Sequence, residues 1–218
     1  MENNQSFLED IIMIKYVIFD FDGTLVDSTK AFISSWNTLA DKYHFKPIQF
    51  EEIEALKKLS IKERSKQKNF PMYKMPFIIP KFYKLYRAAM HDVVLFEGIK
   101  EMLHGLNQKG YKTAIISSNS EENIVDFLDR NEVMTISKVL CSISIFGKDK
   151  LISRFLKENN LDPSEVIYVG DEHRDIMACK KTGVKVIWVS WGYDSIEAVL
   201  EAEPDYQVHA PEDILRIV

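Results

Sequence analysis

Short apolar runs that each end in a cluster of polar residues are the strongest constraint on the fold of this chain. Four runs rich in β-branched and aromatic residues cover Tyr16–Phe19, Lys112–Ile116, Val166–Val169 and Val184–Val189, and a weaker fifth covers Tyr206–Val208. Short runs without clean alternation are typical of strands buried on both faces. The pattern therefore predicts an α/β fold, a Rossmann-like parallel sheet flanked by helices.

Helical patterns separate the predicted strands. Apolar residues recur at helical spacing in Ile99–Lys109, Glu121–Arg130, Leu151–Glu158 and Asp175–Lys181. In sheets of this kind, ligands bind beyond the carboxyl ends of the strands. Each polar cluster follows a predicted strand, so we expect the clusters to meet at that edge of the sheet.

The segment that follows the first strand breaks this alternation. It contains helical patterns at Lys30–Tyr43, at Phe50–Leu59 and from about residue 80 to 90, and prolines precede the third. We predict an all-helical cap inserted over this edge of the sheet. Its aromatic residues either line a pocket or, as is commoner, pack the helices together. They are Phe70, Tyr73, Phe77, Phe82, Tyr83 and Tyr86.

The predicted domains follow from this insertion. Residues 28–94 form the cap, residues 13–27 and 95–218 form the core, and residues 1–12 form a short N-terminal extension without an assigned function. A chain of 218 residues, 46% of them hydrophobic, is long enough for a domain with an insertion.

Composition also narrows the function. The net charge of −5 gives no electrostatic reason to expect a nucleic-acid partner. Cys141 and Cys179 form no CxxC pair, which favours a reducing compartment over a disulfide framework. No apolar stretch approaches a membrane span, and the polar, acidic start lacks the features of a signal peptide. We expect a cytoplasmic protein without a membrane partner; oligomeric state has no signal in the sequence.

The first strand runs directly into Asp20-Phe21-Asp22-Gly23-Thr24. Two carboxylates this close repel each other when both are ionised, so they call for a cation or a proton. Gly23 allows a tight turn past a ligand, and Thr24 adds a hydroxyl and a backbone N–H. An acidic turn is the simpler interpretation. The segment nevertheless suits a nucleophilic carboxylate beside a bound Mg²⁺.

A second acidic cluster follows the third strand. Asp171 ends that strand, and Asp175 lies one helical turn later. Mg²⁺ favours carboxylate oxygens in octahedral geometry. Asp20 and Asp171 are predicted to hold one ion, and Asp175 to bind it through water or to orient its neighbours. Helix capping by Asp171 or Glu172 explains one acid but not two acidic strand ends.

A polar cluster also ends the second strand, where Ser117, Ser118 and Asn119 follow one another. A hydroxyl with nearby backbone amides can bind phosphate oxygens. Two adjacent serines leave the assignment open, and Ser117 is preferred because it sets the following apolar residues at the usual helical spacing. Ser118 and Asn119 are expected to assist through backbone or side chain.

One lysine is positioned to complete this site. Lys148 follows Gly147 before a predicted helix, where it would neutralise a nucleophile and a phosphate together. Lys150 is a near competitor. His173 and Arg174 lie beside the second acidic cluster in the sequence. A position on the solvent-exposed surface is sufficient to explain their polar side chains.

Four segments, taken in order, resemble the signatures of the haloacid dehalogenase-like hydrolases: DFDGT, the strand that ends in Ser117, Lys148, and the GDEHRD segment from Gly170. The helical insertion resembles the cap of that family. The tail from Val184 through Trp191-Gly192-Tyr193 is similar to the phosphoglycolate phosphatase-like branch. The resemblance implies Mg²⁺-dependent hydrolysis of a small-molecule phosphomonoester, either phosphoglycolate-like or a sugar phosphate.

The resemblance also implies roles for individual residues. Asp20 would be the nucleophile that forms an aspartyl-phosphate, and Asp22 the general acid and then base, with its backbone carbonyl as a metal ligand. The implied phosphate-binding residues are Ser117, Ser118, Asn119 and Lys148. The implied metal ligands are Asp20, Asp22, Asp171 and Asp175.

Two alternatives stay open. A sugar phosphomutase of the β-phosphoglucomutase type shares the core groups and would need cap cations to hold a bisphosphorylated intermediate. Candidates for those cations, also explained as a solvated helix face, are Lys57, Lys58, Lys62 and Arg64. The second alternative is a non-catalytic binding or scaffold protein, against which the complete residue set argues. Dehalogenase and phosphonate chemistry are disfavoured because Asp22 retains the acid/base group of a phosphate-ester enzyme.

Overall fold

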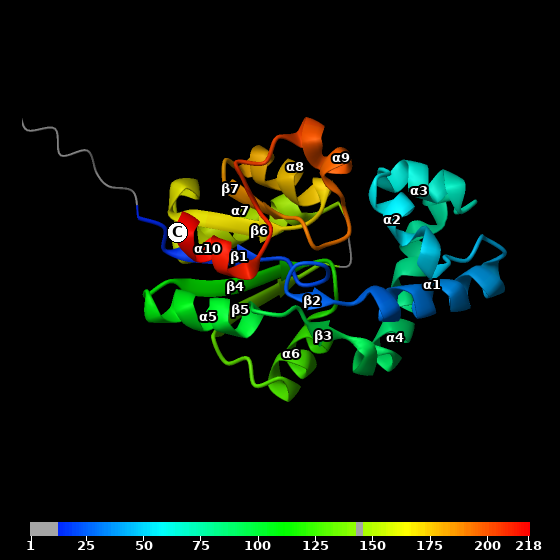
Figure 1. Cartoon of the computed structure of the whole chain (residues 1–218), viewed down its shortest axis with the longest axis horizontal. Helices are drawn as coiled ribbons and strands as arrows, with labels where there is room; N and C mark the ends of the chain where they lie inside the picture. Colours follow the sequence, from blue (N-terminus) through cyan, green and yellow to red (C-terminus); the bar gives the residue numbers. More distant parts are fainter. Residues whose placement is uncertain (1–12, 143–145) are drawn as a thin grey trace, which may run out of the picture.

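A six-stranded parallel sheet forms the centre of the computed structural model, which describes residues 13–142 and 146–218 (Figure 1). The strand order is β5-β4-β1-β6-β7-β8, and all neighbouring pairs are parallel. This arrangement confirms the predicted α/β fold. The strands are β1 (Tyr16–Phe19), β4 (Lys112–Ser117), β5 (Ile136–Cys141), β6 (Val166–Gly170), β7 (Lys185–Val189) and β8 (Tyr206–Val208).

The five predicted strands are all present, and β5 is an addition that the sequence analysis missed. It lies at the edge of the sheet, and Leu140 is the one residue of the strand that is buried. Ser137 and Lys138 interrupt its apolar run, so it lacks the continuous apolar signal of the central strands. The predicted extension at residues 1–12 lies outside the described residues.

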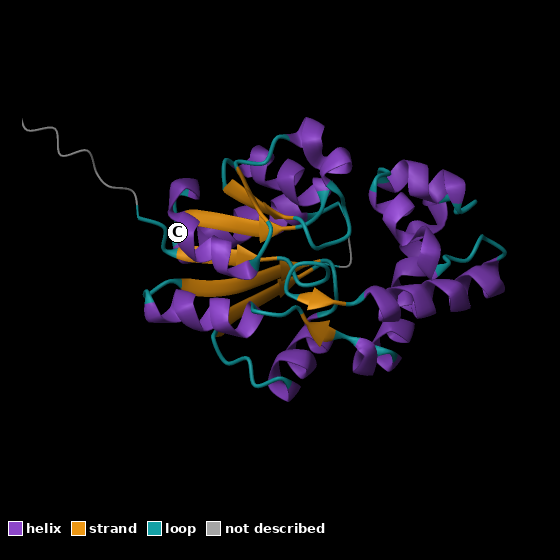
Figure 2. Cartoon of the chain, viewed as in Figure 1, coloured by secondary structure: helices purple, strands orange, loops and turns teal. Residues whose placement is uncertain are grey.

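Helices cover both faces of the sheet, as Figure 2 shows. Successive side chains of β1 point to opposite faces, so Val17 and Phe19 pack with α5, α6 and α10, whereas Ile18 packs with α7, α8 and α9. The covering helices are α5 (Ile99–Gln108), α6 (Glu121–Arg130), α7 (Lys148–Asn159), α8 (His173–Thr182), α9 (Ile196–Val199) and α10 (Pro211–Ile217).

Four further helices form an insertion between two short strands, β2 (Val26–Asp27) and β3 (Val94–Leu95), which pair antiparallel. In Figure 1 this helical insertion lies beyond the carboxyl ends of the sheet strands. It has its own hydrophobic cluster, which includes Leu39, Phe45 and Phe70. The helices are α1 (Thr29–Tyr43), α2 (Ile53–Lys57), α3 (Ile61–Gln67) and α4 (Met75–Ala88).

Helix boundaries in the insertion differ from the sequence prediction. α4 begins before the expected residue 80 and contains both Pro76 and Pro80. Pro76 lies in the first turn, where its missing N–H has no helical partner, and Pro80 interrupts a single hydrogen bond. The predicted helix Phe50–Leu59 is a 3₁₀ turn followed by α2. α3 was not predicted, although Ser60 and Glu63 form its capping box.

Across the part of the chain that the structure describes, no helix combines the length and the apolar composition needed to cross a membrane.

Candidate active site

The polar clusters that follow β1, β4 and β6 meet at the carboxyl edge of the sheet. Asp20 follows β1, Ser117 ends β4 and Asp171 follows β6, while Lys148 and Asp175 join them from the first turns of α7 and α8. All five side chains are buried. The fold therefore brings together residues that are far apart in the sequence, because β1 pairs with both β4 and β6.

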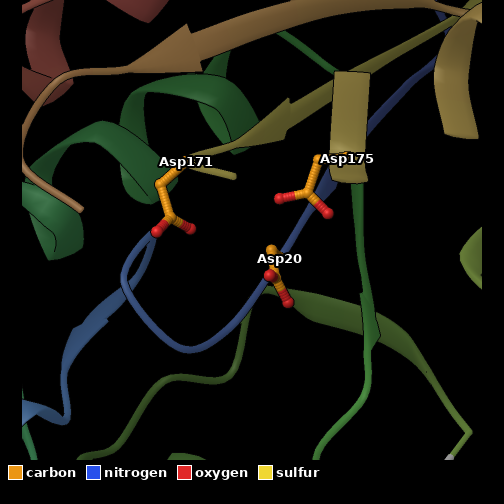
Figure 3. Close-up of side chains that lie close together, drawn as sticks. All are labelled: Asp20, Asp171 and Asp175. Carbon is orange, nitrogen blue, oxygen red and sulfur yellow. The ribbon is translucent and has the colours of Figure 1, made fainter. Parts of the chain in front are cut away.

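Asp20, Asp171 and Asp175 form a three-carboxylate group. One oxygen from each lies within 4.8 Å of the others, and Figure 3 shows the three side chains close together. Burial, with the charges of Glu172 and Asp20, holds the pKa of Asp171 well above its usual range. Burial raises the pKa of Asp175 to about 7, although Lys148 opposes that shift. Hard oxygen donors that repel one another in a dry site fit Mg²⁺, whose charge would offset the repulsion.

Lys148 lies against two members of this group. Its Nζ donates to Oδ2 of Asp20 over 2.5 Å and forms an ion pair with Asp175. Burial lowers the pKa of Lys148, but the charges of Asp175 and Asp20 outweigh burial and hold that pKa above its usual value. Lys150 is exposed on the same helix and therefore faces away from the site.

The loops after β1 and β7 hold Asp171 in place. The Thr24 hydroxyl donates to Oδ1 of Asp171, and the backbone N–H of Tyr193 donates to Oδ2, each over 2.7 Å. Gly23 has φ +79°, and a Cβ at that position would collide with the Asp171 carboxylate. Gly23 therefore permits the close approach of the two acidic loops.

Asp22 lies beside the three-carboxylate group and outside it. Tyr86 of α4 donates its hydroxyl to Oδ1 over 2.5 Å, and Asn119 donates its amide to Oδ2 over 2.8 Å. Burial raises the pKa of Asp22, and the hydrogen bond from Tyr86 opposes that rise. A carboxyl group with a raised pKa that also accepts hydrogen bonds is suited to exchange a proton during a reaction.

Both candidate serines line the same cavity as Asp20. The Ser117 hydroxyl accepts from the backbone N–H of Asn119 over 3.2 Å. The Ser118 hydroxyl accepts from Nη1 of Arg174 over 2.9 Å. Ser117 and Ser118 therefore line the cavity that also contains Asp20, and the side-chain amide of Asn119 contacts Asp22.

Arg174 is a site residue that the sequence analysis missed. Exposure to solvent was expected, but its side chain is largely buried, lines the cavity and forms an ion pair with Glu172. His173, by contrast, is exposed. Tyr86 was named among the cap aromatic residues that either line a pocket or pack the helices, and it lines the cavity. Tyr193 also lines the cavity but was not assigned to the site, because its position depends on how the loop after β7 packs against the core. For Arg174 the sequence signal is its place beside Asp171 and Asp175.

A cavity of about 270 Å³ connects the sheet edge to the helical insertion. Asp20, Asp22, Ser117, Ser118 and Arg174 line its inner end. The remainder of its wall is mainly apolar and comes largely from the helical insertion, with Glu172 and Tyr193 added from the core. The site is therefore polar where the sheet ends and apolar where the insertion covers it.

The sequence matches the family model described as haloacid dehalogenase-like hydrolase over residues 17–189. It is 29% identical to a phosphoglycolate phosphatase from Synechococcus elongatus, with 93% of this chain and 96% of that protein covered. It is 26% identical to the pyrophosphatase PpaX from Bacillus velezensis, with 92% of this chain and 94% of that protein covered.

Solved structures share the fold. A haloacid dehalogenase-like family hydrolase from Streptococcus pneumoniae superposes with a TM-score of 0.79 at 21% identity, covering 94% of this chain and 98% of that chain. A predicted phosphatase from Clostridium acetobutylicum has the same TM-score, identity and coverage. At this level of identity the likeness extends to the fold alone.

Proposed function

This chain belongs to the haloacid dehalogenase-like hydrolase family, and from that premise we propose that it is a Mg²⁺-dependent phosphatase. Its substrate would be a small-molecule phosphomonoester, and its reaction would pass through an aspartyl-phosphate. One observation carries the proposal: Asp20 lies at the inner end of the cavity within the three-carboxylate group, with Lys148 against it and Asp22 beside it. The relatives named as phosphatases support the same reaction class.

In the first step, an oxygen of Asp20 attacks the phosphorus atom, and the bond from phosphorus to the ester oxygen breaks. Asp22, whose pKa burial raises, would act as the general acid and give a proton to the departing alkoxide, which leaves as an alcohol. Ser117, Ser118 and Arg174, which line the cavity, would hold the phosphoryl oxygens. The Lys148 ammonium offsets the negative charge that gathers near Asp20.

In the second step, Asp22 accepts a proton from a water molecule as that water attacks phosphorus. The bond from phosphorus to Asp20 breaks, inorganic phosphate leaves, and both carboxyl groups return to their starting states. Asp20, Asp171 and Asp175 would hold Mg²⁺, with the predicted contribution of the Asp22 carbonyl. When bound, Mg²⁺ supplies positive charge to the phosphoryl oxygens.

We also propose that the helical insertion, residues 28–94, acts as the cap that selects the substrate, in a cytoplasmic protein. A sugar phosphomutase would need cap cations for a second phosphate. Three of the candidates are already in ion pairs: Lys57 with Glu54, Lys58 with Glu197, and Arg64 with Asp194. The described cations therefore favour the phosphatase over the mutase.

Phosphate release from an aryl phosphate, measured with Mg²⁺ and with a chelator, tests this function. We expect turnover that requires Mg²⁺ and is lost in Asp20→Asn. Asp41 is an exposed aspartate of α1, so Asp41→Asn is the matched control and should remain active. Metal-independent turnover, or full activity in Asp20→Asn, would refute the mechanism. An isomerised sugar phosphate in place of free phosphate would identify the mutase, and absence of any turnover would favour the scaffold alternative.

A further inference from the structure

The outer part of the cavity has an apolar wall. Each of the four insertion helices contributes an isoleucine to it: Ile33 from α1, Ile53 from α2, Ile61 from α3 and Ile79 from α4. None of the four belongs to a hydrophobic cluster of the described residues, and all are partly exposed. These side chains are therefore not needed to pack the insertion, and their apolar surface faces the cavity.

The cations along the cavity wall are already paired with carboxylates. Lys68 pairs with Glu52 at 2.6 Å, Arg64 pairs with Asp194, and the Lys57 ion pair with Glu54 is 3.1 Å long. Arg64 also donates to the carbonyls of Leu56 and Lys57, so it is held as a link between insertion and core. An anionic group in the outer cavity would have to break such a pair or remain uncompensated.

The cavity volume limits the length of an occupant. Cavities of about 150 Å³ lined by aliphatic and aromatic side chains hold a benzene ring. The volume here, about 270 Å³, is larger and includes the polar inner end. It has room for a phosphoryl group and an apolar group of roughly six to eight carbons.

We infer that the substrate is a phosphomonoester with an uncharged, apolar leaving group, either an alkyl chain or an aromatic ring. This inference rests on the proposed phosphatase function. The phosphoryl group would occupy the inner end near Asp20, and the leaving group would lie among the four isoleucines. Phosphoglycolate and pyrophosphate carry a second anionic group, for which the described part of the outer wall offers no unpaired cation.

A homologous series of n-alkyl phosphates, from ethyl to hexyl phosphate, tests the inference with Mg²⁺ present. Burial of a methylene predicts that kcat/KM rises about fourfold for each carbon added, until the cavity is filled. We expect hexyl phosphate to exceed phosphoglycolate and pyrophosphate by at least about tenfold. A flat series, or a higher kcat/KM for phosphoglycolate or pyrophosphate, would overturn the inference while leaving the phosphatase function intact.

A lysine placed in the apolar wall provides a second test. Ile79→Lys should lower kcat/KM for hexyl phosphate at least about tenfold and should not lower it for phosphoglycolate. Phe77 lies on the same helix but is 72% exposed and does not line the cavity, so Phe77→Lys is the matched control and should match wild type. If Ile79→Lys does not fold, Ile53→Lys makes the same test from α2. Equal losses on both substrates would contradict the inference.

A binding measurement separates this inference from the proposed function. Asp20→Asn is expected to be inactive, so calorimetry can compare its affinity for hexyl phosphate and for phosphoglycolate without turnover. Tighter binding of hexyl phosphate supports the apolar leaving group even if the wild-type protein hydrolyses no ester. Equal affinities, or tighter binding of phosphoglycolate, would overturn it.

Discussion

Replacing Lys148 with methionine would remove the ammonium that contacts two buried carboxylates. The side chains of Lys148, Asp20 and Asp175 are 3%, 2% and 0% exposed, so solvent cannot screen the charges that are left. Removal of one partner from a buried ion pair typically costs about 3–5 kcal/mol. We expect Lys148→Met to lower the free energy of unfolding of the metal-free protein by about this amount at alkaline pH.

The size of this loss depends on pH. In the wild-type protein burial raises the pKa of Asp175 to about 7, compared with 3.8 for an unperturbed aspartate. A raised pKa means that stability falls as pH rises from the unfolded value to the folded value. Without Lys148 the folded pKa of Asp175 rises further, so the variant continues to lose stability above pH 7, where the wild type does not. The difference between the proteins should therefore be smaller at about pH 5 than at about pH 9.

Urea unfolding in the presence of a chelator, followed by tryptophan fluorescence, measures both effects. Lys150 is exposed two residues later on the same helix, so Lys150→Met is the matched control. Its free energy of unfolding should stay within about 0.5 kcal/mol of wild type. Equal stabilities for the two variants, or a Lys148→Met deficit that does not change between the two pH values, would refute the reasoning.

Three further predictions concern the neighbours of the three-carboxylate group. Tyr86→Phe removes a hydrogen bond that lowers the pKa of Asp22, so the basic limb of the pH profile of kcat/KM should move to higher pH. The exposed Tyr73→Phe should leave the profile unchanged, and an unmoved basic limb in Tyr86→Phe would contradict the role of this hydrogen bond. Gly23→Ala should lower the urea midpoint of unfolding more than Gly110→Ala. Both glycines have positive φ, but only at Gly23 would the added Cβ collide with a buried carboxylate. Equal losses of stability in the two variants would contradict this prediction. Mg²⁺ should raise the melting temperature more at about pH 8 than at about pH 5, because its ligands bind as carboxylates, and a larger shift at the lower pH would argue against the site.

The sequence predicts the core of the fold because the central strands are buried on both faces. The apolar runs before Asp20 and Asp171 are continuous, so their positions and their polar ends can be found from the sequence. β5 could not be found in this way, since an edge strand with Ser137 and Lys138 has no continuous apolar run. Pro80 suggested a helix boundary, but contacts within the insertion stabilise α4 across it.

The residues of the site likewise fall into those that the sequence predicts and those whose positions depend on packing. Asp20, Ser117 and Asp171 belong to strand ends, where parallel pairing makes their proximity predictable. Tyr86 reaches Asp22 from a helix 64 residues away, and its position depends on how the insertion packs against the core. The apolar wall is likewise a property of packing, because four separate helices supply its isoleucines.

The aspartyl-phosphate on Asp20 is the central claim, and trapping it is the most direct test. Asp22→Asn should slow attack by water, so incubation with Mg²⁺ and a phosphate-labelled aryl ester, followed by acid quenching and peptide mapping, should find label on the peptide that contains Asp20. The double variant, in which both Asp20→Asn and Asp22→Asn are present, should carry no label on that peptide. Label on another residue, or release of phosphate by Asp22→Asn without any protein-bound label, would contradict the account.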